Sequence, residues 1–473
     1  MVFSSVIFLL YFLPVVLAVN YLLPKTTRNY WLLLSSFLFY AWGAPQFVFI
    51  LSLSVIANFG LVKVMHDSTH PRARNILLGI SVAINVGLLM YFKYANFFVE
   101  NVNSLLASIG IQALTWTSVA LPIGISFFTF QSLTYSVDVY RKMHEPLKKL
   151  TDYALYIMLF PQMIAGPIVR FYTIADQLVD RTVTHEHFKQ GGHRFVIGLA
   201  KKVLIANTVA EFAAPELLGS DEVLSSTSAW IGILAYTFQI YFDFSGYSDM
   251  AIGLGRMMGF NFPENFNNPY TSGSITEFWR RWHITLGVWM RDYLYIPLGG
   301  NKVSSMGRLY FNLIFVFLVS GLWHGASWNF VIWGCFHGLF LVIERLFLAR
   351  LLKQLPKPVS VIYCFTVVVV GWVFFSIETF DAGLEYLETM FSFQFGPSKL
   401  LLNNKFTITM IVAAVFSFFT LLPQGKQIQD WFFGSKSKPA NRALMNALVI
   451  IMLLYSFMHL IASGFNPFIY FRF

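Results

Sequence analysis

The chain has 473 residues, with 33 Lys and Arg against 23 Asp and Glu, which gives a formal net charge of +10. Apolar residues make up 56% of the chain and charged residues only 12%. A soluble globular protein carries about 25% charged residues, so this chain has too few charges to cover a soluble surface. The high apolar and aromatic content also excludes a disordered chain. The composition therefore favours an integral membrane protein.

Apolar runs recur along the whole chain, so residues 1–473 are interpreted as a single polytopic membrane domain. In chain order the runs lie at 3–23, 30–43, 46–64, 76–98, 118–139, 153–170, 194–213, 228–250, 309–322, 328–348, 359–377, 406–423 and 443–462. A transmembrane helix needs about 20 apolar residues, and several runs are short or broken, so we expect an all-α protein with about 10 to 12 transmembrane helices. The short pieces predict re-entrant or interfacial helices. The first run has no basic residue before it and no clear cleavage site, which predicts a retained span.

Basic residues gather in alternate loops and indicate the orientation of the chain. Six clusters, from Lys25 and Arg28 to the region near residue 435, hold 21 of the 33 Lys and Arg residues. The stretches 211–222 and 378–388 contain acidic residues and no Lys or Arg. Because basic loops stay in the cytoplasm, the N-terminus is expected outside. The net charge is explained by topology and contact with anionic lipids, and nothing resembles a nucleic-acid module.

Cysteine and histidine spacings give no metal or disulfide site. Cys335 and Cys364 lie in separate apolar runs, so neither a disulfide framework nor a Cys-x-x-Cys pair is expected. His283, His324 and His337 are 41 and 13 residues apart, without a His-Glu-x-x-His pair, so no metal is predicted. The absence of a Gly-x-Ser-x-Gly motif argues against a serine hydrolase.

Polar residues concentrate between Gln239 and Arg345. Asp243, Ser245, Tyr247, Ser248 and Asp249 interrupt an apolar run. Ionisable groups at membrane depth usually line a cavity or have an ionic partner. The alternative is that these residues mark a helix end at the membrane interface.

The next segment does not resemble a membrane span. From Gly255 to Arg308 it holds six basic and three acidic residues among many Trp and Tyr. We expect amphipathic pieces at the cytoplasmic face. Arginine binds phosphate with two hydrogen bonds and aromatic rings stack on planar bases, so a phosphate-bearing ligand would suit this surface. Ordinary interfacial anchoring by Arg and Trp is the alternative.

His324 is the strongest candidate for chemistry. It lies between Trp323 and Gly325, in a segment that we do not expect to form a continuous helix. Burial disfavours the charged imidazolium, and a neutral imidazole is the form that a general base requires. The alternative is a structural buried histidine.

Several motifs together resemble the membrane-bound O-acyltransferase family, and within it the bacterial branch of the alginate O-acetylation membrane subunits. They are MVFSS (1–5), LPIGISF (121–127), IAGPI (164–168), YFDFSGYSDMAIGLG (241–255), FWRRWH (278–283), DYLYIPLGG (292–300) and GLWHG (321–325). The resemblance implies that the transmembrane and re-entrant or interfacial helices surround a central tunnel. It places the acyltransferase core at about 120–345 and leaves the C-terminal part without a matching motif. It identifies His324 with the invariant family histidine. His283 occupies a second polar position, which is commonly Asn or Asp in eukaryotic relatives.

The resemblance implies transfer of an acetyl group from a thioester to a hydroxyl inside the bilayer. Acetyl-coenzyme A would be a substrate, not a tightly bound cofactor. We hypothesise that His324 takes the hydroxyl proton and that His283 hydrogen-bonds the oxyanion or orients the donor. The expected substrate-binding residues are Arg280, Arg281, Trp282, Trp323 and Asp249.

The same resemblance predicts a bacterial inner-membrane location and periplasmic SGNH-like partner proteins that place acetyl on an extracytoplasmic polysaccharide. Alginate or a related exopolysaccharide fits best, and peptidoglycan or cellulose O-acetylation are alternatives. A more distant alternative is export of D-alanine to teichoic acid. Outside this class, the architecture also permits a transporter of a polysaccharide precursor or a scaffold of a secretion complex.

Overall fold

The computed structural model describes residues 2–218, 224–398, 400, 403–433, 439–463 and 469. These residues form helices and loops, with no strand among them. Asp221, Glu222, Lys436 and Lys438, which contribute to the charge pattern along the chain, lie outside the described residues. The chain forms two compact units, one of Met1–Gly191 with Leu254–Pro263 and one of Gly192–Gly253 with Glu264–Phe473.

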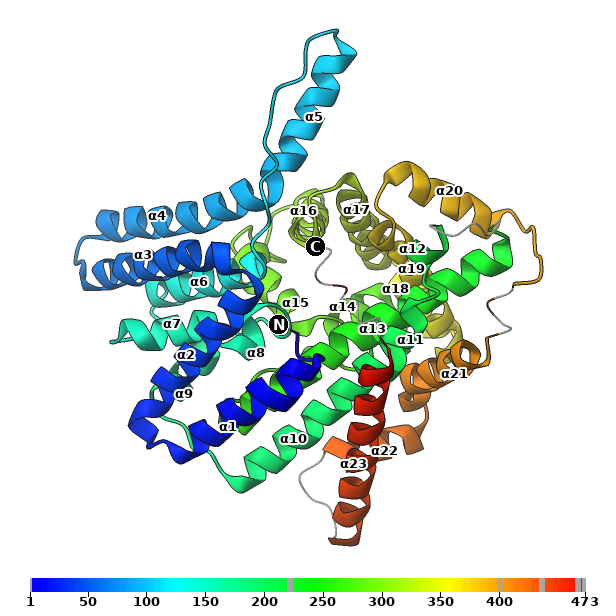
Figure 1. The fold of residues 1–473 in the computed structure, drawn as a ribbon. Coiled ribbons are helices and arrows are strands. Elements are labelled where there is room, and N and C mark those ends of the chain that lie inside the picture. The colour runs from blue at the N-terminus through cyan, green and yellow to red at the C-terminus, as the bar shows by residue number, and fades with distance from the viewer. Residues whose placement is uncertain are drawn as a thin grey trace. The chain divides into compact units, whose positions relative to one another are not determined.

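Most of the first unit comes from the N-terminal part of the chain, drawn from blue to cyan in Figure 1. Its elements are η1 (Phe8–Phe12), α1 (Leu13–Leu22), α2 (Lys25–Gly43), η2 (Pro45–Phe47), α3 (Val48–Asp67), α4 (Pro71–Leu89), η3 (Met90–Tyr94), α5 (Ala95–Ser108), α6 (Ile125–Tyr140), α7 (Leu150–Met158), α8 (Phe160–Met163) and α9 (Phe171–Val179). The apolar run at 153–170 is thus divided between α7, α8 and a loop.

Buried hydrogen bonds join α3, α4 and α6 inside this unit. Ser81 Oγ donates to Asn58 Oδ1 over 2.8 Å and lies 2.7 Å from Ser136 Oγ. Asn85 Nδ2 donates to the same Asn58 oxygen over 2.7 Å. Such side chains hold helices together where lipid offers no hydrogen-bond partner. These polar residues in apolar helices therefore have a structural explanation.

The second unit contains the rest of the helices and both candidate histidines. Its elements are α10 (His185–Ala200), η4 (Lys201–Ala206), α11 (Asn207–Ala210), α12 (Ala214–Leu218), α13 (Ser226–Met257), η5 (Pro269–Thr271), α14 (Ile275–Arg281), α15 (Ile284–Met290), η6 (Arg291–Tyr295), α16 (Met306–His324), α17 (Trp328–Ile343), η7 (Glu344–Leu348), α18 (Ala349–Gln354), α19 (Lys357–Ser376), α20 (Phe380–Phe391), α21 (Asn404–Phe418), η9 (Phe419–Leu421), α22 (Pro423–Phe433) and α23 (Pro439–Ala462). The first turns of α10 and the last turn of α13 belong to the first unit.

The ionisable residues of α13 are paired inside the protein. Asp243 Oδ1 lies 3.0 Å from Lys202 Nζ. Asp249 lies 2.6 Å from Arg194 and 2.7 Å from Lys201. Both aspartates are almost fully buried. Since a buried charge is tolerated only with such partners, the ion pairs account for the acidic residues within this apolar helix.

Helices α16 and α17 pack closely, and His324 lies where α16 ends and the connection to α17 begins. Gly321 faces the carbonyl of Phe330, and Gly334 faces the carbonyl of Phe317, at positions where a side chain would collide. His324 is the last residue of α16, and Gly325 has an extended backbone before α17 begins. The expected discontinuity therefore follows His324, and the segment before it is a regular helix.

Seven helices in the described part of the chain are long and apolar enough to cross a membrane. They span Pro45–Asp67, Pro71–Ser108, Met306–His324, Trp328–Gln354, Lys357–Ser376, Asn404–Leu421 and Ala443–Ala462. The other apolar runs form helices that are more polar or shorter than these seven. The run at 228–250 lies in α13 with its buried aspartates, and the first run forms the short apolar helix Phe8–Leu22. The protein is an all-α, multi-pass membrane protein.

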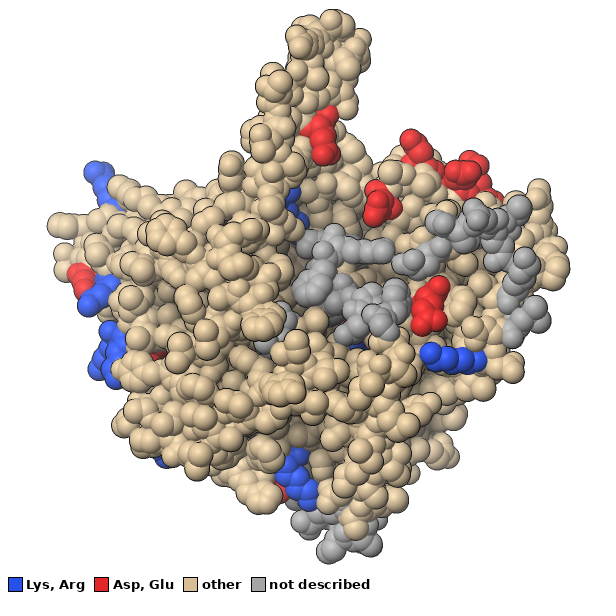
Figure 2. Space-filling view, in the orientation of Figure 1, with Lys and Arg blue, Asp and Glu red and all other residues tan. Residues whose placement is uncertain are grey.

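The two ends of α19 differ in charge. Lys357 is its first residue and Lys353 precedes it in α18, whereas Glu378 follows its end and leads into α20. Acidic side chains gather over α20 (Figure 2), where Asp381, Glu385 and Glu388 are exposed. The preference of basic residues for the cytoplasm predicts that α20 lies on the outer side.

Candidate active site

A pocket of about 810 Å³ lies in the second unit. It lies between α14, α15 and η6 on one side and α16, α17, η7 and the start of α18 on the other. Both His283 and His324 line this pocket. Its lining also includes Arg280, Arg291 and Arg345. Residues that are far apart in the sequence therefore share one cavity large enough for part of a small-molecule substrate.

One face of α16 forms a long wall of the pocket. The lining residues Leu313, Val316, Phe317, Ser320 and His324 recur at intervals of three or four residues. This spacing places them on a single helix face. At a rise of 1.5 Å per residue, the wall extends about 16 Å from Leu313 to His324. The pocket is thus elongated along α16, and His324 marks one end of that wall.

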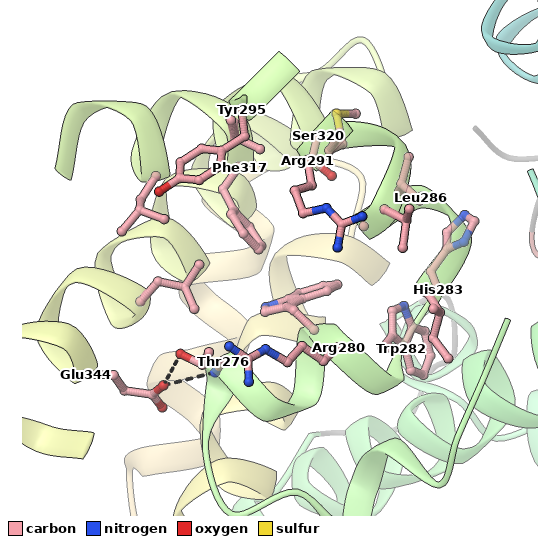
Figure 3. A pocket seen from close by; sticks show the side chains of 18 of the residues that line it. Thr276, Arg280, Trp282, His283, Leu286, Arg291, Tyr295, Phe317, Ser320 and Glu344 are labelled. Atoms are coloured by element: carbon pink, nitrogen blue, oxygen red, sulfur yellow. Dashed lines mark hydrogen bonds between the residues drawn. The ribbon is translucent and has the colours of Figure 1, made fainter. Parts of the chain in front are cut away.

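Arginine side chains give the pocket a cationic region. Arg280 and Arg291 extend into the space between the helices (Figure 3). Arg345 donates a hydrogen bond of 3.3 Å to Asn301, another lining residue. Arg280 forms no hydrogen bond or ion pair with any residue that the structure describes. Arg291 forms an ion pair of 2.7 Å with Asp292. The guanidinium donors that remain, above all those of Arg280, suit an anionic ligand such as a phosphate.

Glu344 is the acidic residue of the lining, and its carboxylate is occupied. It accepts hydrogen bonds from the backbone N–H groups of Ile275 and Thr276 over 2.6 and 2.9 Å, and from Thr276 Oγ1 over 2.7 Å. The dashed lines in Figure 3 show the bonds to Thr276. Ser274 is the N-cap of α14, because its Oγ accepts from Glu277 N over 3.1 Å. The Glu277 carboxylate accepts from the backbone N–H of Gly273 over 2.9 Å. Glu344 thus fixes the start of α14, the helix that carries Arg280.

Aromatic rings surround His324. Its ring centroid lies 4.9 Å from that of Trp323, 5.3 Å from Trp333 and 5.1 Å from Phe375. Each ring meets the imidazole edge to face. These contacts restrict rotation of the imidazole and keep it at the end of the α16 wall.

His283 lies between α14 and α15 with a left-handed backbone, φ +43°. It is 2% exposed, and its Nδ1 lies 3.0 Å from Asn265 Oδ1. Burial lowers its pKa to about 3, so the ring is neutral near pH 7. Its Nε2 has no hydrogen-bond partner among the described residues. In Figure 3, His283 lies on the side of the pocket away from Glu344.

The predicted substrate-binding residues divide into two groups. Arg280 and Trp282 line the pocket with the histidines. Arg281 instead forms an ion pair of 2.6 Å with Glu277, and Asp249 lies in the ion pairs with Arg194 and Lys201. Trp323 supports the rings of His283 and His324 from behind the lining. No group of three His, Cys, Asp or Glu within the described ranges is placed to hold a metal.

Four residues near the histidines had no functional role in the sequence analysis. Arg291 and Arg345 line the pocket. In the sequence, Arg291 was one of the basic residues of the interfacial segment, and Arg345 was part of a basic cluster that indicates topology. Glu344 lies in a π-helical turn that no simple pattern predicts. Asn265 lies in an irregular loop, 18 residues before His283. Only the folded structure brings these side chains to the site.

The fold and the pocket define a multi-pass membrane protein with a buried pair of histidines and a cationic pocket. The membrane-bound O-acyltransferase family model matches residues 34–380. The chain belongs to this family, and it is an O-acyltransferase.

Known relatives cover the whole chain. It is 41% identical to the probable alginate O-acetylase AlgI of Pseudomonas putida over 100% of both chains. It is 36% identical to the peptidoglycan O-acetyltransferase of Helicobacter pylori, over 82% of this chain and 80% of that one. It is 30% identical to the teichoic acid D-alanyltransferase of Bacillus subtilis, over 48% of this chain and 59% of that one. Similarity is thus greater and more complete toward the O-acetylating relatives.

Proposed function

We propose that this protein is a membrane O-acetyltransferase that supplies acetyl groups for O-acetylation of an extracytoplasmic polysaccharide, with alginate as the first candidate. Similarity to the alginate O-acetylases over the full chain supports the polymer class. Peptidoglycan is the alternative acceptor, supported by a relative with lower coverage. A location in the bacterial inner membrane follows from this reaction, because the donor is made in the cytoplasm and the polymer lies outside it.

The observation that carries the proposal is that His283 and His324 line one elongated pocket together with three arginines. Acetyl-coenzyme A is the proposed donor. Arg280, Arg291 and Arg345 would bind its phosphates, and the α16 wall would guide the uncharged arm and the thioester toward His324. The large charged nucleotide then stays at the cationic region, and only the acetyl group reaches the histidines.

Two imidazoles can divide the chemistry of acyl transfer. One accepts the proton of the attacking hydroxyl, and the other stabilises the negative charge that develops on the thioester oxygen. The acceptor is a hydroxyl of the polymer or of a periplasmic SGNH-like partner protein that passes the acetyl group on.

The test uses purified protein in nanodiscs with radiolabelled acetyl-coenzyme A, alone and with candidate periplasmic partners and polysaccharide. Wild type should release coenzyme A and label an acceptor. His324→Ala should lower turnover by at least about 100-fold, the usual size of a general acid–base contribution, at unchanged yield and monodispersity. His185→Ala, at an exposed position of α10, is the control. Full activity of the His324→Ala variant would exclude the proposed site, and a precursor transporter predicts no acetyl transfer by wild type.

A further inference from the structure

The side-chain amide of Asn301 has a fixed orientation at the edge of the pocket. Its Oδ1 accepts a hydrogen bond from Arg345 Nη1 over 3.3 Å and from Tyr295 Oη over 2.8 Å. A guanidinium group can only donate, so the atom that faces Arg345 is the amide oxygen and not the amide nitrogen. Asn301 Nδ2 then carries two hydrogens that have no partner among the described residues. Because Asn301 is an exposed residue of the pocket lining, its amide can donate to a bound ligand.

Asn301 lies near the end of the α16 wall that is farthest from His324. Asn312 Nδ2, on α16, donates to the backbone carbonyl of Gly300 over 3.3 Å. Asn312 immediately precedes Leu313, where the wall begins. This hydrogen bond fixes the loop that carries Asn301 beside the start of the wall, about 16 Å along the helix axis from His324.

Arg345 reaches the same end of the wall from another helix. Gly321 packs against Phe330 and Gly338 packs against Ile314, so α17 runs back along α16 and away from the histidine. Arg345 follows Gly338 by about two helical turns, in η7. Only its Nη1 forms a hydrogen bond within the described part of the chain. We call Asn301 and Arg345 the distal donor pair, which combines a neutral donor with a cationic one.

The separation between the distal donor pair and His324 matches a pantetheine arm that ends in a phosphate. An extended chain advances roughly 3.4 Å for every three bonds. About 14 bonds join the thioester carbon of such an arm to its phosphorus, so the extended arm measures about 16 Å. Val316 and Phe317 form the apolar wall between the two ends. A phosphate at the distal donor pair would therefore place the thioester beside His324.

We propose that Asn301 and Arg345 bind the phosphate that ends the pantetheine arm of the donor, and that the α16 wall selects the length of that arm. The proposal rests on the acetyl transfer proposed above. It adds the requirement that the donor carries a phosphate about 16 Å from its thioester. Coenzyme A and a carrier protein with a phosphopantetheine group share this chemistry. Tyr295 is a positioning residue, because its hydroxyl holds the amide oxygen of Asn301 and leaves Nδ2 to donate.

Asn301→Asp is the most specific variant. It keeps the shape of the side chain and an oxygen for Arg345 and Tyr295, but it replaces the donor Nδ2 with a negatively charged acceptor. In the nanodisc assay, kcat/KM is measured for acetyl-4′-phosphopantetheine and for acetyl-pantetheine, which lacks the phosphate. Wild type should prefer the phosphorylated donor by at least about tenfold, the usual size of a hydrogen bond to a charged group. Asn301→Asp should lose this preference through a higher KM, with kcat/KM for acetyl-pantetheine within about twofold of wild type.

Asn267→Asp is the matched control. Asn267 is an exposed residue of the same unit, and its Oδ1 also accepts a hydrogen bond, from Asn268, but it does not line the pocket. The control adds the same charge and should keep the preference for the phosphorylated donor. Tyr295→Phe should reduce the preference in part, again through KM. An equal loss of kcat/KM for both donors in Asn301→Asp would show a structural role and overturn the proposal, as would an unchanged preference.

The length of the arm is tested with a phosphorylated donor that lacks the β-alanine unit. Its phosphate falls about 5 Å short of the distal donor pair. Wild type should therefore react with this donor no faster than with the same shortened donor without phosphate. A full preference for the shortened phosphorylated donor would overturn the selection of arm length by the α16 wall.

Equilibrium binding of radiolabelled coenzyme A separates this proposal from the proposed acetyl transfer. Asn301→Asp should bind coenzyme A at least about tenfold more weakly than wild type. If both bind it equally while wild type transfers acetyl, the phosphate site is wrong and the transfer stands. If only wild type binds it and no acetyl is transferred, the phosphate site stands and the acetyl donor is wrong. Reaction of an acetylated carrier protein, but not of acetyl-coenzyme A, would support the site and identify the carrier protein as the source of the phosphate.

Discussion

His283 couples the chemistry of the site to the stability of the protein. Its folded-state pKa of about 3 lies below the ordinary value of 6.5. Between these pH values the unfolded chain binds a proton that the folded protein excludes. Stability therefore falls as pH decreases from 6.5 toward 3, and is regained as pH rises.

We expect His283→Gln to flatten this dependence, because the variant has no imidazole to protonate. The difference in slope is at most about 1.4 kcal/mol per pH unit. Thermal unfolding in nanodiscs at a series of pH values measures it. His185→Gln, at an exposed position, should leave the slope as in wild type. Equal slopes for wild type and His283→Gln would show that His283 is not held neutral by burial.

At the scale of elements, α14 depends on a carboxylate from another helix. Three hydrogen bonds join Glu344 to the first turn of α14, a helix of only 7 residues. A helix this short has little stability of its own. The π-helical turn at Glu344–Leu348 is the element from which this side chain reaches α14. The position of Arg280 and the approach to His283 therefore depend on Glu344.

Glu344→Gln should destabilise the protein by about 1–3 kcal/mol, because one oxygen becomes an amide nitrogen that faces an N–H donor. It should also lower the rate of acetyl transfer. Thermal unfolding and the nanodisc assay measure the two effects. Glu378→Gln, which changes an exposed carboxylate beyond α19, should alter neither. A Glu344→Gln variant with the stability and activity of wild type would contradict the role of Glu344 in holding the first turn of α14.

At the scale of the whole molecule, charge orients the chain. The basic start of α19 should face the cytoplasm, and acidic α20 should face the periplasm. Lys353→Cys and Glu385→Cys, each in a background without Cys335 and Cys364, test this with a membrane-impermeant thiol reagent on spheroplasts. Position 385 should be labelled and position 353 protected. The reverse pattern would mean that this unit has the opposite orientation.

Sequence predicted the features that depend on composition and local pattern. The helical membrane class, most helix positions and the pairing of charges in α13 follow from apolar runs interrupted by Asp243 and Asp249. His324 was recognisable from its unusual surroundings, and the family resemblance added His283. Asn265 and Glu344 were not, because their importance comes from hydrogen bonds across 18 and 69 residues of chain. Arg281 differed from its neighbour Arg280 only because successive residues of a helix point in different directions.

The rings of Trp323, Trp333 and Phe375 around His324 also have a consequence for which thioesters the enzyme accepts. If the thioester reacts beside His324, as proposed, these rings flank its carbonyl. Propionyl and butyryl donors should then react progressively more slowly than acetyl. Each added methylene in such a space changes the ratio by about 10- to 200-fold. Phe375→Ala should reduce the ratio of kcat/KM for acetyl to kcat/KM for the longer donors, because the smaller side chain opens room beside the imidazole of His324. If the variant shows the same ranking and ratios as wild type, the length of the acyl group is selected elsewhere.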